Sequence, residues 1–171
     1  KTGNPQEAIA ILQRQLQGSQ TLDQLAILAR AELSQAYIAN KQEAQALAVL
    51  EPLEDREEAI LPLARSLNEI RKNTNNPTLT QRVTTLYRQA LGNNPNPSPS
   101  LLREIADVFS GLPQGEETAL QLYRRLASML PNDKSLVVRQ LALEYKLGAI
   151  AKIDLKQRLA QTLQNLPTDS S

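Results

Sequence analysis

Apolar residues recur along this chain at spacings of three and four, which place them on one face of an α-helix. The two-residue alternation of a half-buried strand is absent throughout the sequence. The pattern therefore predicts an all-α fold. Nine helices are expected, over residues 5–17, 21–39, 41–51, 54–73, 78–92, 99–111, 115–130, 134–147 and 153–165.

Two proline-containing segments interrupt the pattern. Pro62 lies inside the fourth predicted helix, where a proline lacks a backbone donor and clashes with the preceding turn. We therefore expect a kink or a break near residues 60–62. The segment GNNPNPSPS (92–100) has prolines at three alternate positions, so we expect an extended connector there.

One helical segment recurs with a period of 36 residues. Its copies start at Ala8, Ala44, Val83, Ala119 and Leu155, so three of the four steps are 36 residues long and one is 39. Tyr87 and Tyr123 hold the same position within their copies. A fixed period of this length is typical of repeat proteins, in which each repeat buries its apolar face against the next.

A second element lies between these copies: an aliphatic residue, a small residue, two variable positions, then an aromatic residue or Leu. It reads LSQAY (33–37), LARSL (63–67), IADVF (105–109) and LALEY (141–145). The first, second and last positions share one helix face, so the small residue lets a neighbouring helix approach closely. We expect core positions for the aromatic residues Tyr37, Phe109 and Tyr145, and for Tyr87 and Tyr123 on the other helix.

These two elements resemble the tetratricopeptide repeat family, and residues 130–148 (LPNDKSLVVRQLALEYKLG) match it best. The resemblance implies an α-solenoid of helix-turn-helix repeats wound into a right-handed superhelix. It places a single array over residues 1–167, followed by a disordered tail at 168–171. The array consists of a half repeat at 1–20 and repeats at about 21–52, 53–95, 96–131 and 132–167. Other α-solenoids are the alternative at the level of fold.

The resemblance also implies a binding surface, because the first helix of each tetratricopeptide repeat lines a concave groove. Its groove positions lie two before, two after and five after the start of the five-residue motif. They include Gln35, Ile38, Arg65, Asn68, Arg103, Asp107, Arg139, Leu143 and Lys146. The basic residues in this set predict an acidic segment or a carboxyl terminus as the partner, because arginine binds carboxylates through charge-assisted hydrogen bonds. The alternative is that they are ordinary solvated charges on an exposed face.

Composition and charge exclude several classes of function. The net charge is only +1, so nucleic acid is not expected as a partner, and no apolar run approaches the roughly 20 residues that span a bilayer. The chain has no His and no Cys, which removes the usual general base and the commonest metal ligands. The carboxylate pairs Glu57–Glu58 and Glu116–Glu117 are adjacent in sequence and diverge around a helix. We therefore expect neither catalysis nor a cofactor nor a metal site.

The leading hypothesis is a non-catalytic scaffold that binds a peptide or a partner segment in its concave groove. The alternative is a periplasmic repeat region of a bacterial polysaccharide-export or secretion machine, since the Leu/Ala/Gln-rich repeats resemble those of cellulose exporters. Residues 5–17 match the second helix of a repeat whose first helix is missing, which predicts a fragment of a longer array. An uncovered apolar side would then carry Ile9, Ile11, Leu12 and Leu16, and self-association through this edge is expected.

Overall fold

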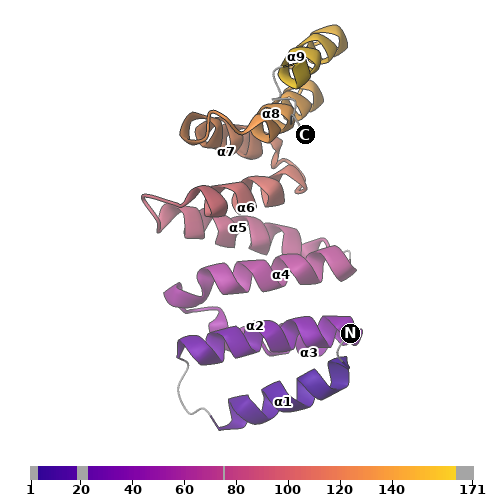
Figure 1. The fold of residues 1–171 in the computed structure, drawn as a ribbon. Helices are drawn as coiled ribbons and strands as arrows, with labels where there is room; N and C mark the ends of the chain where they lie inside the picture. Colours follow the sequence, from indigo (N-terminus) through magenta and orange to yellow (C-terminus); the bar gives the residue numbers. More distant parts are fainter. Residues whose placement is uncertain (1–3, 19–22, 75, 165–171) are drawn as a thin grey trace, which may run out of the picture. The chain divides into compact units, whose positions relative to one another are not determined.

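The computed structural model describes residues 4–18, 23–74 and 76–164, and within them the chain is all-α. Nine α-helices and two short 3-10 segments occur in these residues, with no strand (Figure 1). The α-helices are α1 (Pro5–Gln17), α2 (Gln24–Ala39), α3 (Glu43–Ala48), α4 (Ile60–Thr74), α5 (Thr78–Gly92), α6 (Pro99–Ser110), α7 (Glu116–Met129), α8 (Lys134–Lys146) and α9 (Lys152–Gln164). The 3-10 segments are η1 (Glu51–Leu53) and η2 (Glu57–Ala59).

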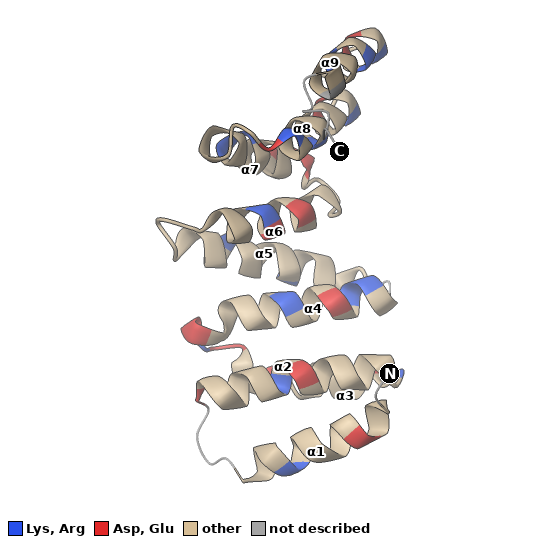
Figure 2. Cartoon of the chain, viewed as in Figure 1, with Lys and Arg blue, Asp and Glu red and all other residues tan. Residues whose placement is uncertain are grey.

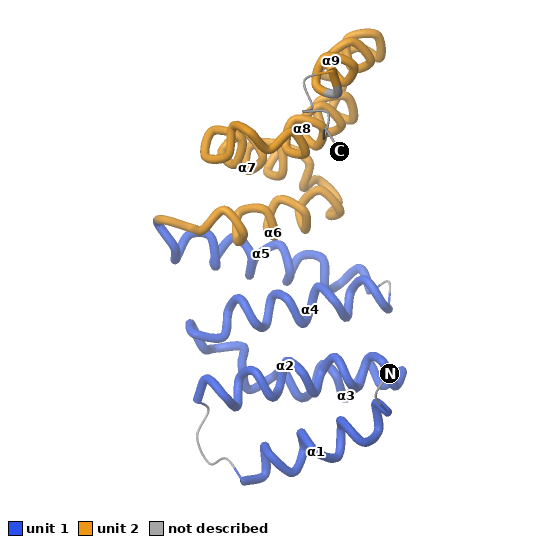
Figure 3. Tube along the Cα trace, in the orientation of Figure 1, with its two compact units in different colours: residues 1–95 blue, residues 96–171 orange. Residues whose placement is uncertain are grey.

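The helices form two compact units, Lys1–Pro95 and Asn96–Ser171 (Figure 3). In unit 1, α2 packs against α1, α3 and α4, and α4 packs against α5. In unit 2, α6 packs on α7, α7 on α8, and α8 on α9. The boundary between the units falls where the sequence predicts the end of one repeat and the start of the next. The expected tail at 168–171 lies outside the described residues.

Side chains cap the helices where the sequence pattern begins them. The Asp23 carboxylate accepts a hydrogen bond from the Ala26 amide at 2.8 Å, and the Ser98 hydroxyl accepts one from the Leu101 amide at 3.3 Å. Pro5 and Pro99 occupy the first position of their helices, where the missing N–H would have no partner within the helix. These caps explain why the observed bounds follow the predicted ones within a few residues at most helix ends.

The predicted helix over 54–73 is wrong over residues 54–59, and the break expected near residues 60–62 falls at Ile60. The α-helix begins at Ile60 instead, after η2. Pro62 is thus the third helical residue, where no hydrogen bond within the helix is lost. The predicted helix over 41–51 is also shorter. Pro52 lacks the N–H that would bond the Ala48 carbonyl in a continued α-helix, so α3 ends at Ala48 and the chain continues as η1.

Aromatic and aliphatic side chains from the two repeated elements form the core of each unit. Tyr87, Phe109 and Tyr123 are 1 % exposed and Tyr37 is 8 % exposed, as the sequence predicts. Tyr145 is 45 % exposed, so its predicted core position is wrong. It lies in the last turn of α8. The helix that follows, α9, packs on α8 but buries none of its described residues, so Tyr145 stays exposed.

The N-terminal helix packs less deeply than α2, the helix that it lies against. None of its described residues is fully buried, and Ile11 is 57 % exposed. Leu25 and Leu28 at the start of α2 are also exposed. Self-association through this edge stays a prediction. Among the described helices, none combines the length and the apolar character needed to cross a bilayer.

Gly115 closes the tight turn between α6 and α7. A Cβ atom at this position would overlap the Phe109 carbonyl oxygen and lie 2.9 Å from its carbonyl carbon. Both are backbone atoms and cannot rotate away, so only glycine fits without moving one helix relative to the other. Gly92, at the end of α5, would have no atom within 4 Å of an added Cβ and offers a matched comparison.

We predict that Gly115→Ala lowers the free energy of unfolding by about 2 kcal/mol or more, because the clash forces a backbone shift in a packed core. Gly92→Ala should leave it unchanged or raise it slightly, because alanine is the better helix former. Urea unfolding followed by circular dichroism measures both variants. Equal stability of the two would show that the turn has room for a side chain.

Candidate partner-binding surfaces

The residues predicted to line a groove are divided between the two units. Gln35, Arg65, Asp107, Arg139 and Lys146 have exposed side chains, and Arg103 is partly exposed. Asn68 and Leu143 do not line an open surface as expected, because they are 3 % and 6 % exposed within their units. The Asn68 carboxamide oxygen accepts hydrogen bonds from Arg71 at 3.2 and 2.9 Å, so its polar group is satisfied within α4.

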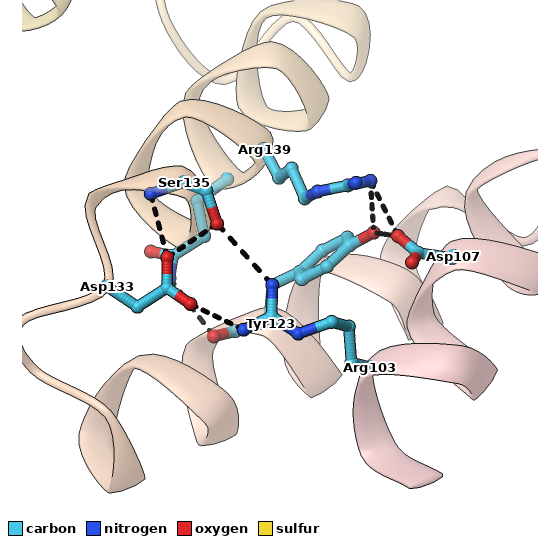
Figure 4. Close-up of polar contacts among 7 residues, drawn as sticks. Arg103, Asp107, Tyr123, Asp133, Ser135 and Arg139 are labelled. Carbon is cyan, nitrogen blue, oxygen red and sulfur yellow. Dashed lines mark hydrogen bonds and ion pairs between the residues drawn. The ribbon is translucent and has the colours of Figure 1, made fainter. Parts of the chain in front are cut away.

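In unit 2, ion pairs bridge α6 and α8 (Figure 4). Arg103 on α6 binds the Asp133 carboxylate at 2.5 Å, just before α8 begins. The other oxygen of Asp133 accepts hydrogen bonds from the Ser135 amide at 3.0 Å and the Ser135 hydroxyl at 2.5 Å. The Ser135 hydroxyl and then Arg103 lower the pKa of Asp133 below its ordinary value, because both stabilise the carboxylate.

A second bridge joins Asp107, Tyr123 and Arg139. The Arg139 guanidinium lies 2.6 Å from the Asp107 carboxylate and 3.1 Å from the Tyr123 hydroxyl, which itself donates to Asp107 (Figure 4). Arg139 also lies over the Tyr123 ring, 5.7 Å from its centroid. Burial, together with the hydrogen bond to Asp107 and its negative charge, raises the pKa of Tyr123 to about 12.

The three basic residues of unit 2 that were predicted to line a groove are therefore neutralised by carboxylates of the same unit. Lys146 pairs with Glu116 at 2.6 Å, so Arg103, Arg139 and Lys146 each have a carboxylate partner within the unit. The Lys146 ammonium lowers the pKa of Glu116 through its hydrogen bond. Figure 2 shows basic and acidic residues interleaved along α6 and α8. An acidic segment would have to displace these pairs in order to bind here.

In unit 1 a groove lies between α2 and α4, which run side by side in the same direction (Figure 1). We call it the α2–α4 groove; its volume is about 230 Å³. Two predicted groove positions of α2, Gln35 and Ile38, line it. The full lining is Ser34, Gln35, Ile38 and Ala39 from α2, and Ser66, Glu69, Ile70 and Asn73 from α4.

Two hydroxyl groups lie in the floor of this groove without hydrogen-bond partners. Ser34 is 1 % exposed and Ser66 is 2 % exposed, and neither hydroxyl contacts a donor or acceptor. Leaving a buried polar group unsatisfied costs roughly 1–3 kcal/mol, so such groups are rare in folded proteins. Two of them beneath one groove suggest a ligand that supplies the missing partners.

The two units have different residues at two positions of the repeat, those two before and two after the start of the five-residue motif. In unit 2 these include Arg139 and Asp107, which pair across neighbouring helices. The corresponding residues in unit 1 are Leu61 and Gln35, which are neutral and cannot form an ion pair. Of these two, Gln35 lines the α2–α4 groove.

Sequence reasoning missed Ser34, Ser66, Glu69 and Asn73 as site residues. One signal was present for Ser34, because it occupies the small position of its motif, where the other three copies have Ala64, Ala106 and Ala142. Packing at this position requires only a small side chain, so a hydroxyl there is not explained by packing. Among the described residues, no group of three Asp or Glu side chains could hold a metal ion.

Two other hollows are larger, and each is lined by a residue that forms an ion pair. One, of about 360 Å³, lies between α4 and α5 and contains Arg82, which binds Glu54. The other, of about 470 Å³, lies between α8 and α9, where Glu144 pairs with Arg124 and Arg158. Neither hollow has a buried hydroxyl that lacks a partner in its lining.

Comparison with known protein families, with curated proteins and with solved structures found no match for the chain. The resemblance to tetratricopeptide repeats thus rests on the repeated residues alone. Function has to be argued from the α2–α4 groove and from the ion-paired face of unit 2.

We predict that Ser34→Ala and Ser66→Ala each stabilise unit 1, because each removes a buried hydroxyl that lacks a partner. The expected gain is about 1 kcal/mol, which raises the melting temperature of a unit of this size by about 4–8 °C. Ser128→Ala is the matched control, since that hydroxyl is exposed and bonds the Arg125 carbonyl at 2.7 Å. Thermal unfolding that shows a loss of stability in the two groove variants would contradict this.

We further predict that Tyr123 ionises near pH 12, above the ordinary value of 10. Between these values only the unfolded chain loses the phenolic proton, so stability falls as the pH rises from 10 to 12. The difference in ultraviolet phenolate absorbance between wild type and Tyr123→Phe isolates this group, and phenylalanine keeps the ring in the core. A difference that titrates at pH 10 would rule out the raised pKa.

Proposed function

We propose that this chain is a non-catalytic protein-interaction scaffold and that a segment of a partner protein binds in the α2–α4 groove of unit 1. The observation that carries the proposal is the pair of buried, unpartnered hydroxyls of Ser34 and Ser66 beneath an open groove. A partner that presents hydrogen-bonding groups to the groove would remove this cost.

The chemistry of the lining supports binding rather than reaction. Ile38 and Ile70 supply apolar contact area, while Gln35 and Asn73 supply carboxamide groups that can both donate and accept hydrogen bonds. One carboxylate, Glu69, lines the groove, and no second titratable group lies in the lining to form an acid–base pair with it. A few convergent polar groups over an apolar base suit recognition of a peptide.

The repeat pattern supports the same proposal. In a tetratricopeptide-like array, the first helices of successive repeats lie next to each other and share one face, and α2 and α4 are those helices in unit 1. The offset from the motif predicts Gln35 and Ile38 on this face, and both line the groove. An α-solenoid of this kind would use the open face between its first helices as the contact surface.

Unit 1 is a better candidate than the basic residues of unit 2. The pairs at Arg103 and Arg139 are partly exposed, and pairs of this kind contribute only about 0–1 kcal/mol each. An acidic segment that replaced them would exchange one carboxylate for another with little gain. The α2–α4 groove, by contrast, has unsatisfied groups for a partner to bind.

Bulk placed at the mouth of the groove tests the proposal. Peptides selected from a random library on the folded full-length chain should bind Ala39→Trp at least about tenfold more weakly than wild type, because the indole fills the groove. Ala44→Trp is the matched control, since Ala44 is also exposed but lies on α3 outside the groove. Isothermal titration calorimetry gives the affinities, and circular dichroism confirms that both variants fold.

Two results would contradict the proposal. One is a library selection that enriches no peptide on the folded chain. The other is a set of selected peptides that bind Ala39→Trp and Ala44→Trp equally well, which would place the contact surface elsewhere on the molecule.

A further inference from the structure

The lining of the α2–α4 groove carries several hydrogen-bond acceptors, one carboxylate and no cationic side chain. Glu69 is the only charged residue in the lining, and neither Lys nor Arg is part of it. The Ser34 and Ser66 hydroxyls and the carboxamide oxygens of Gln35 and Asn73 can all accept hydrogen bonds. One N–H of the Asn73 carboxamide donates to the Glu69 backbone carbonyl at 2.8 Å, which leaves its other N–H and its oxygen for a partner.

The position of the groove along the two helices adds to this character. Its lining comes from residues 34–39 of α2 (Gln24–Ala39) and from residues 66–73 of α4 (Ile60–Thr74), so it lies at the C-terminal half of both helices. The C-terminal end of a helix carries a partial negative charge, which favours cations near it. The partial negative charges of the two helix ends and the negative charge of the Glu69 carboxylate therefore all favour a cation in the groove.

The size of the groove limits what can enter it. Pockets for drug-sized ligands enclose about 300–1,000 Å³, whereas this one encloses about 230 Å³. A single long side chain of a partner fits such a space better than a whole ligand. Its apolar stem would lie against Ile38 and Ile70, and its head would meet the polar groups.

We propose that the α2–α4 groove binds a lysine side chain of the partner segment, an inference that rests on the binding function proposed above. A lysine ammonium is a compact charge with three donors. These equal in number the acceptors that the Ser34 hydroxyl, the Ser66 hydroxyl and the Glu69 carboxylate provide in the lining. Both hydroxyls are buried in the free chain, so binding requires each serine to rotate about its Cα–Cβ bond toward the ammonium. The planar fork of arginine needs acceptors arranged side by side and suits this site less well.

The existing ion pair of Glu69 does not block this arrangement. Lys72 binds one carboxylate oxygen at 2.8 Å, and the side chains of this pair are 53 % and 46 % exposed. A carboxylate has a second oxygen that can accept from the incoming ammonium. An exposed pair one helical turn apart contributes little, so Lys72 can also turn away into solvent.

Short peptides test this assignment on the full chain. The probes are acetyl-Ala-Ala-Lys-Ala-Ala-amide and the same peptide with norleucine, arginine or glutamate at the central position. Amide chemical shifts from NMR titration report both the affinity and the place of binding. The lysine peptide should shift residues 34–39 and 66–73 and bind about tenfold more tightly than the norleucine peptide, because only the ammonium forms charge-assisted hydrogen bonds.

Variants of the lining separate the charge from the hydroxyls. Glu69→Gln should weaken lysine binding about fivefold or more, and the double variant Ser34→Ala, Ser66→Ala should weaken it to a similar extent while remaining folded. Glu58→Gln is the matched control: Glu58 is also in unit 1, 56 % exposed and paired with a nearby cation, Arg56, at 3.9 Å. It should leave the affinity unchanged.

The failure of this inference differs from the failure of the proposed function. If the norleucine and lysine peptides bind the groove equally, or the arginine or glutamate peptide binds more tightly, the assignment to lysine is overturned while the groove remains a binding surface. Unchanged lysine binding in Glu69→Gln also overturns it. If neither these probes nor the library peptides bind in a way that Ala39→Trp weakens, the scaffold function of the groove fails with it.

Discussion

The burial of apolar helix stripes against the next helix is the constraint on which each unit depends. A single repeat cannot cover its own stripe, so helices in the middle of a unit are buried on several sides and those at the edge are not. In unit 1, α2 has neighbours in α1, α3 and α4 and buries Ile27, Leu33 and Tyr37. In unit 2, α9 packs on α8 and buries none of its described residues. The exposure of Tyr145 follows from the same rule.

Small residues set how closely the first helices approach one another. One of these small positions is occupied by Ser34, which also lines the groove of the proposed function. Ala64 and Ala106 fill the small slot and are completely buried. Ser34 fits the same slot by size but adds a hydroxyl, and Ser66 adds a second one nearby. Alanine would satisfy the packing requirement at lower cost, so packing alone does not explain the two serines. A buried serine where packing requires only a small residue, and whose hydroxyl has no hydrogen-bond partner in the fold, is a reasonable place to look for a ligand contact.

Much of the fold could be predicted from the sequence, because helix formation depends on local spacing and caps. The bounds of α1 and α5 match the periodic pattern, and the buried Tyr87, Phe109 and Tyr123 follow from the repeat. The predicted helix over 54–73 started too early, whereas the break near residues 60–62 was predicted correctly, because a proline is tolerated in the first turn of a helix and not further inside it. Asn68 and Leu143 were assigned to a surface by an offset rule that ignores how far neighbouring helices cover each position.

Ion pairs such as Asp107–Arg139 join residues on separate helices, and their formation depends on the distance between those helices. The α2–α4 groove was missed for the same reason, since Glu69 and Asn73 line it only through the packing of α4 on α2.

The spaces between neighbouring first helices differ in the two units. In unit 2, Arg103–Asp133 and Asp107–Arg139 bridge α6 and α8, whereas in unit 1 a groove lies between α2 and α4. The bridges contribute little to stability, because exposed pairs contribute only about 0–1 kcal/mol each, whereas burying one large apolar side chain contributes about 1.5–3 kcal/mol. Apolar burial therefore holds the helices together in both units, and the buried hydroxyls without a partner, Ser34 and Ser66, lie in the unit whose first helices are not bridged in this way.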